Sequence, residues 1–195
     1  MHFILSNWPL AFVCSAMNVA AVIDGWKLKV PNWLTFPLVI GGWALGLAHN
    51  FGLWESTGTG GIGASLAGTG VGFALLFPVY AIGGMGAGDV KMQMGFGSWV
   101  GSYFGLWTGL STIFWAFCVA VIIGGVIGLG MMLIRGQFAR NLNNTREIIG
   151  DLFTADSVGE VANRAAKRKS RLHLLPYGIP LCLGFVSYLV YLHGF

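Results

Sequence analysis

Two aspartates have the residue type and position that hydrolytic chemistry requires. Asp24 follows the apolar run 3–23, and Asp89 stands between a glycine-rich stretch and a second apolar run. The other acidic residues are Glu55 and four in the segment 135–171. An acid at the edge of an apolar span is costly and is therefore a functional candidate. Two neighbouring carboxyl groups share one proton, so one polarises a carbonyl while the other activates water, as in aspartic proteases.

Each aspartate taken singly also has a structural explanation. Asp24 could pair with Lys27 or Lys29 and help to fix the topology, and Asp89 could cap the N-terminus of a helix, where a carboxylate is favourable. The four histidines lie at span ends and form no Ser/His/Asp set. Taken together with their flanking residues, the two aspartates favour catalysis.

The composition indicates a membrane protein with a single domain, residues 1–195. Hydrophobic residues make up 55% of the 195 residues and charged residues 9%, against about 45–50% and about 25% in soluble domains. The three cysteines are widely separated and form no Cys-x-x-Cys pair, so neither a zinc site nor a disulfide framework is indicated. The net charge is +4, but no basic patch is interleaved with aromatic residues, so we expect no nucleic-acid partner.

Apolar runs of the length needed to cross a bilayer predict an all-α, polytopic protein with about six transmembrane helices. The predicted spans are 3–23, 33–48, 62–82, two helices within 90–134 that are separated by a turn near 102–105, and 172–192.

The basic residues predict the orientation of these spans. All eleven Lys and Arg residues fall in the loops 24–32, 83–91 and 135–171, which share one side of a six-span protein. Cytoplasmic loops are enriched in Lys and Arg, so these loops are predicted to be cytoplasmic and both termini to face outward. Within 135–171, Ser157 and Glu160 suggest a capping box that opens a short amphipathic helix on lipid headgroups. The alternative is a solvated basic loop that enforces topology.

Glycines recur every four residues from Gly97 to Gly109, a spacing that allows close helix packing. This series crosses the turn predicted near 102–105. A single helical face from Gly97 to Gly109 and a turn at this point exclude one another, so one of the two predictions must be wrong.

Three stretches carry a family resemblance. Residues 84–91, GMGAGDVK, contain Gly-x-Gly-Asp, and residues 24–32, DGWKLKVPN, place Pro-Asn seven and eight residues after an Asp. Residues 175–180, LPYGIP, form a Pro-aromatic-Gly segment that ends in Pro. In their order along the chain, 24–32, 84–91 and 175–180, the three stretches resemble the first, second and third motifs of the type IV prepilin peptidases, which are membrane aspartic proteases.

The resemblance implies Asp24 and Asp89 as the catalytic pair, with no metal or organic cofactor. It implies prepilin and pseudopilin substrates, each with a basic leader before an apolar helix. The leader would be cleaved at the cytoplasmic face of the prokaryotic inner membrane, among membrane lipids. Because the paired Cys-x-x-Cys segment of longer members is absent, the chain resembles the short Tad/Flp-type form, and no methyltransferase activity is expected. The oligomeric state is left open.

Supporting roles are expected for further motif residues. Gly86 and Gly88 lack a Cβ, which permits positive φ and close approach of a substrate backbone to Asp89. Pro31 fits the first turn of the second helix, and Asn32 is expected to bond the connecting loop. Lys91 either influences which aspartate holds the proton or anchors the cytoplasmic end. The third motif contributes Pro176 and Gly178.

Other function classes compete with proteolysis. A small proton- or cation-coupled transporter would use the two acids as its site, although acids in mid-span would favour it more. A non-catalytic component of a pilus or secretion machine would use them as anchors. Presenilin-like proteases pair Gly-x-Gly-Asp with a Tyr-Asp in an earlier span, whereas residue 23 is isoleucine.

Overall fold

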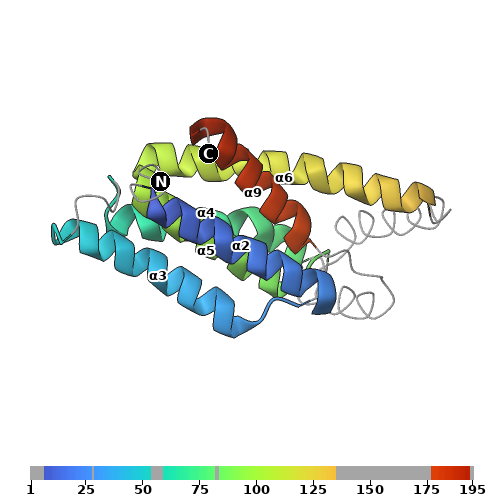
Figure 1. Ribbon diagram of the computed structural model, residues 1–195, viewed down its shortest axis with the longest axis horizontal. Coiled ribbons are helices and arrows are strands. Elements are labelled where there is room, and N and C mark those ends of the chain that lie inside the picture. Colours follow the sequence, from blue (N-terminus) through green and yellow to red (C-terminus); the bar gives the residue numbers. More distant parts are fainter. Residues whose placement is uncertain (1–6, 28, 54–58, 82–83, 135–176, 194–195) are drawn as a thin grey trace, which may run out of the picture.

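The computed structural model describes residues 7–27, 29–53, 59–81, 84–134 and 177–193, and these residues form helices and no strand. The all-α prediction is confirmed for them. Glu55, Pro176 and the loop 135–171 with its predicted amphipathic helix lie outside the described residues. The helices are α2 (Trp8–Lys27), α3 (Asn32–Asn50), α4 (Ile62–Ala81), α5 (Ala87–Phe104), α6 (Leu106–Ile134) and α9 (Gly178–His193) (Figure 1).

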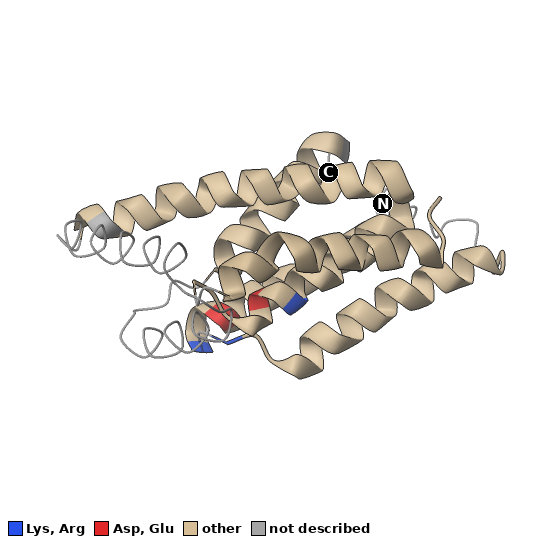
Figure 2. Cartoon of the chain, turned by 180° about the vertical axis from the view of Figure 1, so that it is seen from behind, with Lys and Arg blue, Asp and Glu red and all other residues tan. Residues whose placement is uncertain are grey.

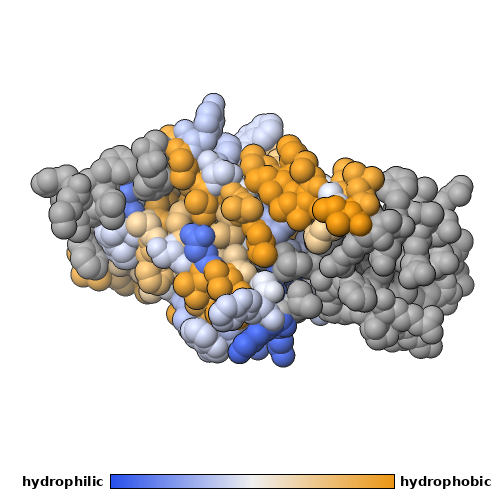
Figure 3. All heavy atoms as spheres, turned by 45° about the vertical axis from the view of Figure 1, so that its right-hand side comes forward, coloured by the Kyte–Doolittle hydropathy of each residue, from blue (hydrophilic) through white to orange (hydrophobic). Residues whose placement is uncertain are grey.

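The apolar character of the helices extends to their outer surface. Within the described residues, α2, α4 and residues Leu106–Met131 of α6 are long and apolar enough to cross a membrane, and α9 is a shorter apolar helix. Large apolar side chains are exposed, among them Trp107 at 81% and Leu133 at 71%, and Figure 3 shows broad apolar surface on the face in view. Such a surface suits lipid contact. The count of six spans and the orientation of the termini stay predictions.

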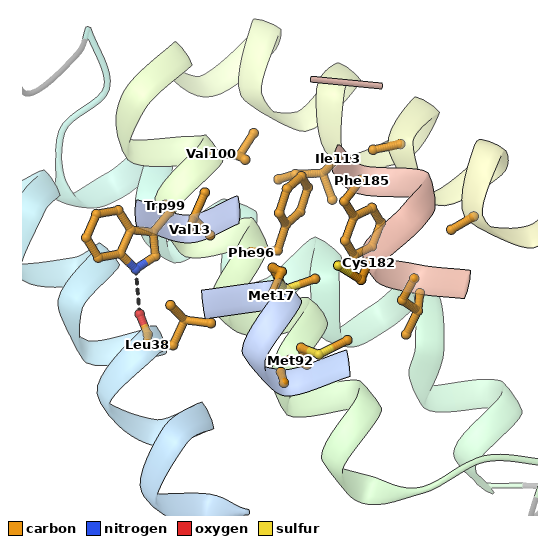
Figure 4. Packing of buried hydrophobic residues seen from close by; sticks show 14 of the residues in the cluster. Val13, Met17, Leu38, Met92, Phe96, Trp99, Val100, Ile113, Cys182 and Phe185 are labelled. Carbon is orange, nitrogen blue, oxygen red and sulfur yellow. Dashed lines mark hydrogen bonds between the residues drawn. The ribbon is translucent and has the colours of Figure 1, made fainter. Parts of the chain in front are cut away.

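Helix α5 is the central element of the bundle. It contacts every other described helix, and twelve of its eighteen residues are buried. The Trp99 indole donates a hydrogen bond of 2.7 Å to the Leu38 carbonyl of α3, which supplements the apolar packing (Figure 4). On the other side of α5, the Phe96 ring stacks on Phe185 of α9 with 4.2 Å between centroids. The position of α5 is thus fixed from several directions.

Glycines allow α4 and α5 to approach backbone to backbone. A Cβ on Gly97 would overlap the Gly68 carbonyl, and a Cβ on Gly68 would overlap the Gly97 carbonyl. Gly105, with φ of +80°, ends α5 before α6 begins. The predicted turn is therefore confirmed, and the glycine series is divided: Gly101 packs on α4, while Gly109 lies on α6 against Gly101.

The two ends of the helix bundle differ in the charged residues that they contain. The first residues of α2 lie near the last residues of α9 (Figure 1). The described acidic and basic residues gather toward the opposite end (Figure 2). There α2 ends, residues 84–86 lead into α5, and α9 begins. This end contains the described residues of the three sequence motifs.

Candidate active site

Asp24 lies in the last turn of α2, with 4% of its surface exposed. Its Oδ2 accepts a hydrogen bond of 2.9 Å from the backbone N–H of Gly178, the first residue of α9. The first N–H groups of a helix have no intrahelical acceptor and favour a negative charge. Asp24 therefore caps a helix that lies 154 positions later in the sequence. A Cβ on Gly178 would lie 2.9 Å from this carboxylate oxygen, so a glycine allows the contact.

Asp89 lies in the first turn of α5, with 5% of its surface exposed. Its Oδ2 accepts a hydrogen bond of 3.2 Å from the backbone N–H of Gly86, which precedes the helix. The prediction that Asp89 caps the N-terminus of a helix is thus confirmed. Each buried aspartate therefore receives a backbone N–H at the N-terminus of a helix, an environment that stabilises a carboxylate in an apolar interior.

Two consecutive residues connect the aspartates. Gly178 binds Asp24 through its N–H, and the preceding residue, Tyr177, interacts electrostatically with Asp89. Helices α2 and α5 are also in direct contact, and Figure 2 shows the acidic segments side by side at one end of the molecule. Both aspartates and Gly178 therefore lie at the same end of the helix bundle (Figure 2).

The segment between α2 and α3 packs on the start of α5. A Cβ on Gly88 would lie 3.1 Å from the backbone nitrogen of Val30, so the two backbones are close. Lys91 donates a hydrogen bond of 2.9 Å to Asn32, and its ammonium lies 4.7 Å from the centroid of the Phe36 ring. These contacts join the motif 24–32 to the motif 84–91. The hydrogen bond between Asp24 and Gly178 joins the motif 24–32 to the described part of the motif 175–180.

Residues 11–129 match the model of the type IV leader peptidase family. The chain belongs to this family. The matched region contains both aspartates and ends before Tyr177 and Gly178. Comparison with curated proteins and with solved structures gives no match. As a member of the type IV leader peptidase family, the chain is an aspartic peptidase that acts on prepilin-type substrates.

Two boundaries in this family member differ from those predicted. Helix α2 continues past Asp24 to Lys27, and α5 begins at Ala87, before Asp89. The difference at α5 follows from capping, because the Asp89 carboxylate satisfies the Gly86 N–H and so stabilises an earlier start. Within the described residues, Asp24 forms no ion pair with Lys27 or Lys29, and its carboxylate binds Gly178 instead.

The positive φ that was expected at Gly86 and Gly88 is not found, whereas the approach of a substrate backbone to these glycines stays a prediction. Gly86 has φ of −81°, and among the described glycines only Gly52 and Gly105 have positive φ. The reason is that Gly86 is the N-cap, which takes extended backbone, and Gly88 lies within the helix. The backbone that approaches Gly88 in the structure is that of Val30.

Three other residues can be compared with their predicted roles. Pro31 is the N-cap of α3, one residue before the first turn, with φ of −73° and ψ of 144°. The Asn32 side-chain oxygen accepts a hydrogen bond from Lys91 on α5, and no bond from Asn32 to the described residues 29–31 of the connecting loop is found. The Lys91 contacts with Asn32 and Phe36 suit its anchoring role.

Sequence reasoning missed Gln93 as a residue of interest. It lies one turn after Asp89 on α5 and is fully buried, and neither atom of its side-chain amide has a hydrogen-bond partner in the described part of the chain. Residues four apart share a helix face, so Gln93 adds polar atoms near the site. The sequence feature that could have identified Gln93 is a side-chain amide within the long apolar run 90–134. Among the described residues, no three His, Cys, Asp or Glu side chains form a group that could hold a metal ion.

Proposed function

We propose that the protein is a membrane-embedded aspartic endopeptidase that removes the cytoplasmic leader from prepilins and pseudopilins. Asp24 and Asp89 are its catalytic pair, and the pilus system is of the Tad/Flp-like type IV class. It works in the inner membrane of a prokaryote, with its active site at the cytoplasmic face and without methyltransferase activity. The observation that carries this proposal is the burial of Asp24 and Asp89 at facing ends of two contacting helices, α2 and α5, where each carboxylate accepts a backbone N–H.

The chemistry follows from two carboxyl groups that share one proton. The ionised carboxylate takes a proton from a water molecule as that water attacks the carbonyl carbon of the scissile peptide bond. The protonated carboxyl donates a hydrogen bond to the carbonyl oxygen and stabilises the negative charge that develops there. Collapse of the tetrahedral intermediate expels the new amino terminus, which takes up a proton from the pair.

The hydrogen bonds from the backbone do not assign the two roles to particular residues. The Gly178 N–H favours the ionised form of Asp24, and the Gly86 N–H favours the ionised form of Asp89. Because both acids receive one such bond, either can be the ionised member, and the pair titrates as a unit.

Cleavage is tested with purified protein in detergent and a full-length prepilin. We expect a product shortened by the leader, identified by its mass, together with the released leader peptide. A protein reconstituted in vesicles that moves protons or cations but leaves the prepilin intact would contradict the proposal and support the transporter alternative.

The orientation gives a separate prediction. In a variant whose native cysteines are replaced, we expect a single cysteine at Lys29 to react with an impermeant thiol reagent only after the cytoplasmic side is opened. A single cysteine at Phe51, which is exposed next to the far end of α3, should react in intact cells or spheroplasts. Labelling of both positions from the same side would contradict the orientation, because α3 would then not cross the membrane.

A further inference from the structure

An apolar groove lies between α4, α6 and α9. Its volume is about 430 Å³. Phe117, Gly124, Gly125 and Leu129 line it from α6, and Met85 and Tyr177 line the end that faces the motifs. The groove is separate from the aspartates but continuous with the segments that hold them.

Both residues at that end precede a residue that binds an aspartate. Met85 comes directly before Gly86, whose N–H binds Asp89, and Tyr177 comes directly before Gly178, whose N–H binds Asp24. A segment lying in the groove and leaving it at this end would therefore pass next to both carboxyl groups.

The glycines of α6 in this groove differ from the glycines that pack within the protein. A Cβ on Gly97, Gly101 or Gly184 would overlap the backbone of a neighbouring helix, so those positions are filled. A Cβ on Gly125 would meet nothing within 4 Å, and one on Gly124 would touch only Pro180. Small residues in membrane helices allow another backbone to approach closely, and at Gly124 and Gly125 the protein supplies no such backbone among its described residues.

The length of the groove matches a helix in one half of a bilayer. Its wall on α6 runs from Phe117 to Leu129, about 18 Å along the helix axis at about 1.5 Å per residue. The hydrocarbon core is about 30 Å thick. The groove thus offers an apolar surface through roughly the inner half of the hydrocarbon core, and it ends near the segments that hold Asp24 and Asp89.

We propose that this groove holds the apolar helix of the substrate, with its N-terminal end at Met85 and Tyr177 and the leader extending past the aspartates. The inference rests on the proposed function, because it takes the substrate to be a leader followed by an apolar helix. A helix is favoured over a lipid chain because the groove leads to the acids and because its glycine wall admits a backbone.

The test compares two glycines of α6 that both face open space. Gly125 lines the groove, and Gly130 does not. Cleavage is measured for Gly125→Leu, Gly130→Leu and wild type on a full-length prepilin and on a soluble peptide that spans the cleavage site but lacks the helix. We expect Gly125→Leu to lower the ratio of full-length to peptide cleavage at least tenfold, mainly through KM, and Gly130→Leu to keep the wild-type ratio. Equal ratios in the two variants would overturn the inference.

A crosslinking experiment gives an independent answer that does not depend on turnover. In an Asp89→Asn background, a photoreactive residue at position 125 should form adducts with the apolar helix of the bound prepilin, and one at position 130 should not. Adducts with lipid alone at position 125 would overturn the inference. Failure of the proposed function would look different, since wild type would then cleave neither substrate.

Discussion

Replacing Asp24 or Asp89 with asparagine should lower the rate of leader cleavage by about 10³-fold or more, the upper part of the range for general acid–base catalysis. An amide can neither accept the proton of the attacking water nor share a proton with the opposite acid. The measurement is the rate of product formation under single-turnover conditions, with enzyme in excess over prepilin.

Asparagine also separates chemistry from folding. Its side-chain oxygen can still accept the Gly178 N–H at position 24 or the Gly86 N–H at position 89. We therefore expect each variant to be extracted as a monodisperse protein with thermal stability close to wild type. Alanine at position 24 removes the cap as well and should lower the stability of the protein. Cleavage by either asparagine variant at more than a tenth of the wild-type rate would contradict the assignment of that residue.

The second large effect is expected from one added methyl group between α4 and α5. A Cβ on Gly68 would overlap the Gly97 carbonyl and lie 3.2 Å from Ile113. Overpacking of this kind forces backbones apart, so we expect Gly68→Ala to lower the free energy of unfolding by about 3 kcal/mol. Because α5 carries Asp89, cleavage should fall with stability.

Gly70 provides the matched control on the same helix. It is exposed, and a Cβ there would meet nothing within 4 Å. We expect Gly70→Ala to be neutral or to stabilise the helix by up to about 1 kcal/mol. Both variants are compared by denaturation in the same detergent. If Gly68→Ala and Gly70→Ala unfold alike, close packing of α4 on α5 does not determine stability.

Helix positions could be predicted well because they depend on local composition. The predicted span 62–82 corresponds to α4 (Ile62–Ala81), and the predicted span 33–48 to α3 (Asn32–Asn50). The turn at Gly105 was foreseen from the length of the apolar run, since 45 residues exceed what one span requires. These features need only hydrophobicity and length.

The contacts that join the motifs could not be predicted in the same way. The bond between Asp24 and Gly178 links residues 154 positions apart, and the pairing of Lys91 with Asn32 links residues 59 apart. Both depend on which helices are neighbours. The presence of glycine alone did not distinguish a positive φ from an N-cap with extended backbone, so the positive φ expected at Gly86 is not found. Its N–H serves to cap α5 through Asp89.

The cap that Asp24 provides to α9 has a mechanical consequence. A neutral carboxyl holds a helix N-terminus less tightly than a carboxylate does. In the proposed mechanism, protonation of Asp24 would therefore weaken its hydrogen bond to Gly178 at the start of α9, and deprotonation would strengthen it again. Tyr177 and Pro180, at the start of α9, also border the groove beside α6. Protonation of Asp24 during hydrolysis would thus weaken the attachment of one wall of the groove. This weakening would facilitate release of the cleaved product from the proposed binding site.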